Sequence, residues 1–365
     1  MNLDILKKGK GCLYMISIAC FPLSHDMLTM LQYKELMVDY EIVAINSFKE
    51  DIFIKKLELK YPECKISSDI YEVLEESDGL LLLDNKEEYK WNKYQEILKM
   101  AQTLNKKVLM SEELCAKMEV GTREKVELLQ TKLPHKEKTK NEELKSIEAP
   151  VIAVAGMGEN CSKFESCLLV LKVLKERGYS VTFLSSNSLA MLFGGYTYPT
   201  YLYSESLSLE QKIWYLNQDI SDYVEKNETD VILIELPGGI MPLGENAKNH
   251  FSECAIAVAN AIKIDVGILN IYVPSYRNGD RFIYLKDYCD YKYEMQIEKI
   301  FMARQKVEYD QARHEYVYMH LDDVTYNKMW EKYCNENIIR LTRKEQAEKA
   351  VIEILRLLEE NPEFI

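Results

Sequence analysis

The residues best suited to chemistry lie in a short stretch, VIAVAGMGENCSKFESCLLVL, at residues 151–171. Gly156 and Gly158 can form a tight turn whose backbone amides face an anion. Lys163 stands seven residues after Gly156, where the lysine of a phosphate loop reaches the β and γ phosphates. Asn160 adds a polar side chain to the same turn. This pattern predicts an anion or nucleotide site, in which backbone amides and one ammonium group hold phosphate.

The two neighbours of this lysine depart from the phosphate-loop pattern. Ser162 stands where glycine usually lets the backbone approach phosphate, so a Cβ enters that space. Phe164 stands where a Ser or Thr hydroxyl holds magnesium. ATP turnover therefore requires another magnesium ligand, which Glu159 or Glu165 would have to supply. The alternative to a working site is a turn that only begins a helix.

A second stretch, DVILIELPGGIMPL at residues 230–243, ends an apolar strand with an acid, Glu235. The pair Gly238 and Gly239 follows and predicts a turn. Ligands of α/β proteins bind at the carboxyl ends of central strands, which favours Glu235 as a site residue. A solvated loop acid is the alternative. We therefore group Glu235, Gly238 and Gly239 with the lysine loop as candidate cofactor-binding residues.

These two motifs resemble those of dethiobiotin synthetase and its amidoligase relatives, a group with a P-loop fold. GMGENCSKF keeps that group's spacing of five residues between its first glycine and its G-K-T, and IELPGG is similar to its EGAGG strand. The resemblance covers residues 151–273. It implies that Lys163 contacts phosphate and that Glu235 holds a metal or the metal's water. The cofactor implied is a nucleotide with magnesium.

The motifs AVAGMGENCSKFE, FGGYTYP and ELPGGIMP together resemble a family of clostridial-type peptide maturation system proteins. Such proteins accompany radical-SAM maturases of cysteine-rich ribosomal peptides. The resemblance runs along the whole chain and is strongest over residues 151–242. It implies an accessory role in peptide maturation, with a precursor peptide, the maturase or a small carrier-like protein as partners. No particular chemistry comes with this resemblance.

Two further features allow a functional and a structural interpretation. The loop FGGYTYPTYLYSES, residues 193–206, carries four tyrosines suited to recognise a peptide or a ring-bearing ligand, or else to pack over the sheet. Cys161 at a helix N-terminus would have a lowered thiol pKa if it faces the site. It would behave as a small hydrophobic residue if it packs inward.

Composition limits the other classes of function. The 365 residues carry a formal net charge of −13, with 47% hydrophobic and 29% charged residues. An acidic chain has no basic excess to bind a nucleic-acid backbone, so we expect no nucleic-acid partner. No apolar run approaches the roughly 18 residues that span a membrane, and no signal peptide is recognisable, which predicts a cytoplasmic protein without a membrane segment.

Nine widely spaced cysteines favour reduced thiols. The five histidines have no ligand spacing, so no metal site is predicted.

Two series of short apolar strands alternating with helical patterns predict an α/β fold with parallel sheets. We expect a Rossmann-like domain at residues 1–131, a charged linker at 132–148 and a degenerate P-loop NTPase-like domain at 149–365 with a C-terminal helix. Both domains are expected to be doubly wound. The first strand-to-helix loop, ACFPLSHD, lacks the G-x-G-x-x-G fingerprint of dinucleotide sites. Two further strands, EKIFMARQ and EYVYMHL, are expected near the C-terminus.

Three hypotheses follow for the whole chain. The first is an accessory binding protein that recognises an anion or a partner without turnover. The second is an ATP-dependent ligase or kinase-like enzyme of the dethiobiotin synthetase type. The third is a homodimer with its site at the interface, which exposed aromatic residues of the tyrosine-rich C-terminal region would favour.

Overall fold

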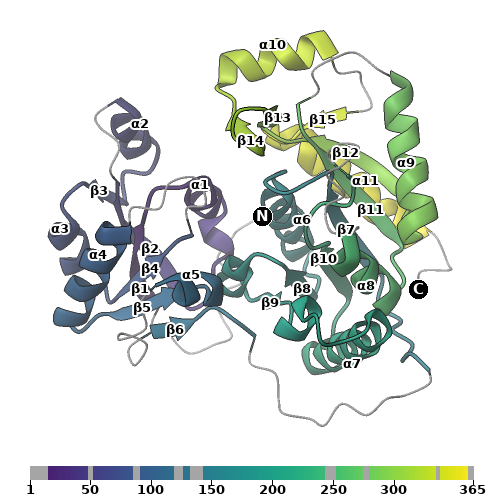
Figure 1. Cartoon of the computed structure of the whole chain (residues 1–365), viewed down its shortest axis with the longest axis horizontal. Helices are drawn as coiled ribbons and strands as arrows, with labels where there is room; N and C mark the ends of the chain where they lie inside the picture. The colour runs from purple at the N-terminus through teal and green to yellow at the C-terminus, as the bar shows by residue number, and fades with distance from the viewer. Residues whose placement is uncertain are drawn as a thin grey trace. The chain divides into compact units, whose positions relative to one another are not determined.

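The computed structural model in Figure 1 describes most of the chain. The described residues are 15–47, 52–84, 91–118, 126–131, 143–242, 252–273, 279–333 and 338–360. By its internal contacts the chain divides into two compact units. The first comprises Met1–Gln130 with Met191–Gly194, and the second comprises Thr131–Ala190 with Gly195–Ile365. Most of the expected linker, 132–142, lies outside the described residues.

The first unit is a six-stranded sheet in the order β3-β2-β1-β4-β5-β6, with every neighbouring pair parallel. This is the strand order of the Rossmann fold. The core combines strand residues with helix residues such as Val73 and Ile97. Its elements are β1 (Ile16–Phe21), α1 (His25–Gln32), η2 (Lys34–Leu36), β2 (Tyr40–Asn46), α2 (Ile52–Lys60), β3 (Lys65–Ser67), α3 (Ile70–Glu75), β4 (Gly79–Leu82), α4 (Trp91–Thr103), β5 (Lys107–Met110), α5 (Glu112–Lys117) and β6 (Val126–Leu128).

The second unit is a seven-stranded parallel sheet in the order β15-β12-β11-β7-β10-β8-β9. A separate antiparallel hairpin, β13 with β14, follows β12. The elements are β7 (Val151–Gly156), α6 (Lys163–Glu176), β8 (Val181–Ser185), β9 (Tyr196–Thr197), η5 (Thr200–Tyr203), α7 (Leu209–Asn227), β10 (Val231–Glu235), α8 (Glu253–Ala261), β11 (Val266–Ile271), α9 (Gly279–Tyr293), β12 (Ile297–Met302), β13 (Gln305–Asp310), β14 (Glu315–His320), α10 (Asp323–Tyr333), β15 (Ile338–Arg340) and α11 (Lys344–Glu360). The short helix η4 (Ser188–Phe193) has residues in both units.

The central strands of the second unit are apolar along their whole length because both faces of the sheet are covered. All residues of β7, β10 and β11 are buried. Helices α6 and α11 pack against each other, and α7 packs against α8 (Figure 1). Because β7 lies between β10 and β11, the loop after it opens at the point where the strand order reverses. The prediction of an α/β fold with parallel sheets is confirmed.

The C-terminal region contains more structure than the two predicted strands. The expected strands at EKIFMARQ and EYVYMHL correspond to β12 and β14. Strand β13 between them is an addition, and it pairs only with β14 among the described residues. The sequence QKVEYD of β13 lacks the apolar pattern of a strand, because both faces of this strand are partly exposed.

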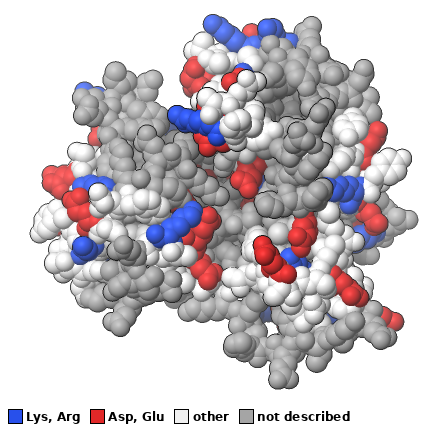
Figure 2. All heavy atoms as spheres, in the orientation of Figure 1, with Lys and Arg blue, Asp and Glu red and all other residues white. Residues whose placement is uncertain are grey.

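The surface of the described residues is mixed in charge. Lys and Arg side chains lie singly or in small groups among Asp and Glu on the face shown in Figure 2. Across the described ranges, no helix combines the length and the apolar character needed to cross a membrane.

Candidate functional site

The loop between β7 and α6 is built on a glycine that makes room for a lysine. Gly156 ends β7, and Lys163 is the first residue of α6. A Cβ placed on Gly156 would lie 2.9 Å from Lys163 Cδ and 3.1 Å from the carbonyl oxygen of Gly158. Ile240 donates its amide to the Gly156 carbonyl at 3.0 Å, which joins the loop after β10 to this turn. Glycine is therefore needed here for close packing under the lysine.

Two residues of the turn adopt the left-handed conformation. Asn160 and Ser162 each have φ near +51°, a region that glycine and asparagine enter more readily than serine. Ser162 stands at the glycine position of the phosphate-loop pattern and keeps the backbone conformation that favours glycine. Its hydroxyl does not cap α6 and donates to Gln305 Oε1 at 3.0 Å instead. The Asn160 side chain is exposed and has no hydrogen-bond partner among the described residues.

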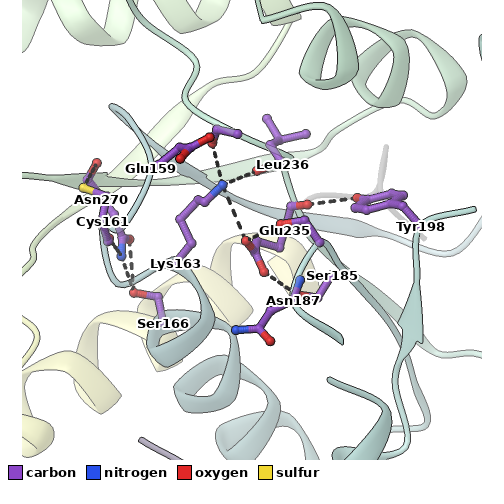
Figure 3. Close-up of polar contacts among 12 residues, drawn as sticks. Glu159, Cys161, Lys163, Ser166, Ser185, Asn187, Tyr198, Glu235, Leu236 and Asn270 are labelled. Atoms are coloured by element: carbon purple, nitrogen blue, oxygen red, sulfur yellow. Dashed lines mark hydrogen bonds and ion pairs between the residues drawn. The ribbon is translucent and has the colours of Figure 1, made fainter. Parts of the chain in front are cut away.

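Lys163 is buried, and its ammonium group faces the segment that follows β10 (Figure 3). Nζ donates to the carbonyl oxygens of Leu236 at 2.7 Å and Gly238 at 2.5 Å. The same atom lies 3.5 Å from Glu235 Oε1, with both side chains less than 10% exposed. The lysine of the predicted loop and the acid of the predicted strand thus form one buried ion pair.

Glu235 ends β10 and is surrounded by hydroxyl groups. Ser185 donates to Glu235 Oε2, and Ser186 donates to Oε1 at 2.9 Å. The phenol of Tyr198 donates to the backbone carbonyl of Glu235 at 2.9 Å. These donors and Lys163 allow a carboxylate to remain buried, because its charge is paired and hydrogen-bonded. Figure 3 shows Ser185 and Tyr198 approaching Glu235 from different segments.

The glycine pair after β10 contacts Lys163 and the residue just before α8. Gly238 has φ +66° and turns its carbonyl toward Lys163. Gly239 accepts a hydrogen bond from the Ser252 hydroxyl at 2.9 Å, which links the turn to the start of α8. The structure therefore brings Gly156, Lys163, Glu235 and Gly238 together, and Gly239 lies beside them. Of the other predicted site residues, Asn160 is exposed and Ser162 contacts Gln305 instead of this group.

Asn270, near the end of β11, holds the other side of the loop. Its Nδ2 donates to the Cys161 carbonyl at 2.9 Å and to Ser166 Oγ at 2.8 Å. Its backbone carbonyl accepts from the Met157 amide at 2.9 Å and from the Cys161 thiol at 3.3 Å. The Asn270 side chain is fully buried. Sequence reasoning missed this residue, although a single asparagine in the apolar strand VGILNI was a usable signal.

Cys161 packs inward in a small cluster with Tyr272 and Ala303. Burial raises the pKa of its thiol to about 12, although the charge of Lys163 and the amides of Met157 and Gly158 oppose the shift. Burial and the raised pKa therefore favour the neutral thiol over the reactive thiolate. Of the two alternatives for Cys161, inward packing is the one the structure supports, because desolvation outweighs the local positive field.

Tyr272 and the β13–β14 hairpin contact the loop between β7 and α6 on the side of β11. The Tyr272 hydroxyl donates to the backbone carbonyl of Glu159. The ring of Tyr318, on β14, lies 6.0 Å from that of Tyr272. Sequence reasoning missed both contacts, because nothing local relates residue 159 to residues more than 100 positions away.

The tyrosine loop is mostly packed against its own unit. Tyr198 is buried, and the ring of Tyr196 stacks on Tyr223 with centroids 4.1 Å apart. Tyr201 donates to Asp219 at 2.5 Å, and burial raises the pKa of its phenol. Tyr203 is 51% exposed. These contacts support the structural interpretation of the loop and leave one exposed tyrosine for recognition.

The residues fit a phosphate group better than a magnesium ion. Phe164 is buried and has no atom that can ligate a metal. Glu159 is exposed on the loop, and Glu165 is half-buried. Within the described ranges, no three His, Cys, Asp or Glu residues form a group able to hold a metal ion. The amide-rich turn, the lysine and the N-terminus of α6 suit an anion.

No protein-family profile and no curated protein matches the chain. The crystal structure of a DUF1611 family protein from Anabaena variabilis is similar in fold, with a TM-score of 0.55 and 14% identity; the match covers 93% of this chain and 99% of that one. At this identity the likeness concerns the fold alone.

Two other solved structures have lower scores. A nucleotide-binding protein from Archaeoglobus fulgidus in complex with ADP has a TM-score of 0.29 at 14% identity, covering 59% of this chain and 90% of that one. The 54 kDa signal recognition particle protein from Aeropyrum pernix in complex with GDP has a TM-score of 0.30 at 12% identity, covering 59% and 51%. These two scores support no function. The chain is an α/β protein with two parallel sheets, and in its second unit the buried strand β7 leads through a glycine-containing loop into helix α6.

Proposed function

We propose that the second unit binds a nucleotide through the loop between β7 and α6, with Lys163 as its phosphate contact. One observation carries this proposal: Lys163 is the first residue of α6 and directly follows a turn with two left-handed residues. Such a turn and helix N-terminus direct backbone amides toward an anion. A phosphate would replace the carbonyls of Leu236 and Gly238 as partners of Nζ.

Binding without rapid turnover is the form of this proposal that the residues favour. Magnesium, when bound, would neutralise phosphate charge, but Phe164 occupies the position of its usual hydroxyl ligand. Glu235 Oε1 lies 3.5 Å from Lys163 Nζ, and the two carboxylate oxygens of Glu235 accept hydrogen bonds from Ser185 and Ser186. The ligase or kinase-like alternative requires a metal ligand that these contacts do not supply.

The test is isothermal titration of the full chain with ATP, ADP and GTP in the presence of magnesium. We expect Lys163→Met to weaken nucleotide binding at least about tenfold, because a hydrogen bond to a charged group contributes about 1.5–3 kcal/mol. The matched control is Lys263→Met, which removes a lysine whose side chain is 78% exposed. Lys163→Arg keeps the charge, and circular dichroism of each variant reports folding.

Three results would change this proposal. If the wild-type chain binds none of the three nucleotides, the loop is no nucleotide site. If Lys163→Met and Lys263→Met weaken binding equally, the loss reflects net charge and not a contact. Release of inorganic phosphate from ATP by the wild type, absent in Lys163→Met, would replace simple binding with the enzyme alternative.

We further propose, from the sequence motifs alone, that this binding serves an accessory role in the maturation of a ribosomal peptide. The partners would be a precursor peptide, a radical-SAM maturase or a carrier-like protein, and the protein would act in the cytoplasm, alone or as a homodimer. We expect a labelled cysteine-rich precursor peptide to bind the full chain in fluorescence anisotropy, with an affinity that changes when nucleotide is added. Equal anisotropy with and without the protein would remove this role.

A further inference from the structure

The hairpin formed by β13 and β14 lies beside the phosphate loop and belongs to no larger sheet among the described residues. Gln305, the first residue of β13, accepts the Ser162 hydroxyl, and both residues are buried. Val307 and Tyr318 pack against the cluster that contains Cys161 and Tyr272. One end of the hairpin is therefore anchored on the loop that contains Lys163.

The pairing register determines which residues share the face that meets the loop. Residues directly opposite in an antiparallel pair point to the same side, and alternate residues of a strand share a face. Gln305 pairs with His320, Val307 with Tyr318, and Tyr309 with Tyr316. Since the first two pairs include loop contacts, Tyr309 and Tyr316 extend the same face beyond the anchored end.

The residues of this extended face, Tyr309 and Tyr316, are both aromatic. The rings of Tyr309 and Tyr316 have centroids 5.1 Å apart, and Tyr309 is 49% exposed. The acids of the two strands, Glu308, Asp310 and Glu315, fall at register positions of the opposite face. The side of the hairpin toward the loop thus carries no carboxylate that would repel a phosphate ligand.

We propose that Tyr309 and Tyr316 form the surface on which the base of the bound nucleotide stacks, an inference that rests on the function proposed above. Tyr309 lies four positions after Gln305 in β13, which corresponds to about 13 Å along the strand. Because Gln305 contacts Ser162, the residue before Lys163, this length describes how far along the hairpin the aromatic pair lies from the loop. Aromatic side chains stack on any base, since every base presents a π face. The pair therefore supplies affinity for a nucleobase with little preference among bases.

The test compares ATP with inorganic tripolyphosphate, which has the phosphates and no base. We expect Tyr309→Ala to weaken ATP binding at least about fivefold, the low end of the range for loss of a base stack. Tripolyphosphate binding should stay at the wild-type level. Tyr309→Phe keeps the ring and should bind ATP as the wild type does, although it loses the contact between the Tyr309 hydroxyl and His314 Nδ1 at 3.4 Å.

The matched control is Tyr291→Ala, which removes an 89% exposed tyrosine from α9. Equal weakening of ATP and tripolyphosphate by Tyr309→Ala would overturn stacking, because the hairpin would then only hold the loop. Wild-type affinity for ATP in both Tyr309→Ala and Tyr316→Ala would overturn it as well. Either result overturns stacking while the wild-type chain still binds nucleotide, whereas a wild-type chain that binds neither probe removes the proposed nucleotide site itself.

Discussion

Lys163→Met is expected to lower the free energy of unfolding by about 3–5 kcal/mol, the range found when one partner of a buried ion pair is removed. The substitution leaves the Glu235 carboxylate, whose side chain is 4% exposed, without its cation. It also removes the donor to the carbonyls of Leu236 and Gly238. Methionine keeps the unbranched stem, so the loss reflects charge and hydrogen bonding more than packing. Urea unfolding followed by circular dichroism measures it.

A double-mutant cycle with Glu235→Gln separates this pairing from other causes. If the ion pair is the source of the loss, the double variant should be more stable than the sum of the two single effects predicts, by about 0.5–3 kcal/mol. The control Lys263→Met, at an exposed lysine, should change stability little. Additive single effects would show that Lys163 and Glu235 do not stabilise one another.

Asn270→Ala should destabilise the protein by about 2–4 kcal/mol, because each buried polar group left without a partner costs about 1–3 kcal/mol. The substitution removes the hydrogen-bond donor to the Cys161 carbonyl and the Ser166 hydroxyl, and both residues are fully buried. It also frees the start of α6 from β11, so we expect nucleotide affinity to fall together with stability. Thermal and urea unfolding give the first effect, and titration of ATP gives the second.

Asn260→Ala is the matched control for this prediction. Asn260 is exposed on α8 and donates only to the Ile256 carbonyl of its own helix among the described residues. Its loss should change stability by a few tenths of a kcal/mol. If Asn270→Ala were as mild as Asn260→Ala, water would have to replace the lost contacts, and the asparagine would not be what holds the loop.

The sequence by itself determined the fold class and the location of the loop. Apolar strands of five or six residues in alternation with helical patterns predict parallel sheets, since such strands must be covered on both faces. The glycine, lysine and acid motifs lie at the carboxyl ends of strands, and the carboxyl ends of parallel strands meet at one edge. Lys163 and Glu235 therefore had to come close once β7 and β10 became neighbours.

Only the tertiary structure decided how the altered loop is supported. Ser162 meets Gln305 across 143 residues, and Asn270 meets Cys161 across 109. Such contacts depend on strand order and register, which no local pattern records. The thiol of Cys161 illustrates the same limit: its position left open whether it faces the site with a lowered pKa or packs inward, and burial in the fold raises its pKa to about 12. Local sequence determines which groups are present, and packing determines whether they face water, an ion or each other.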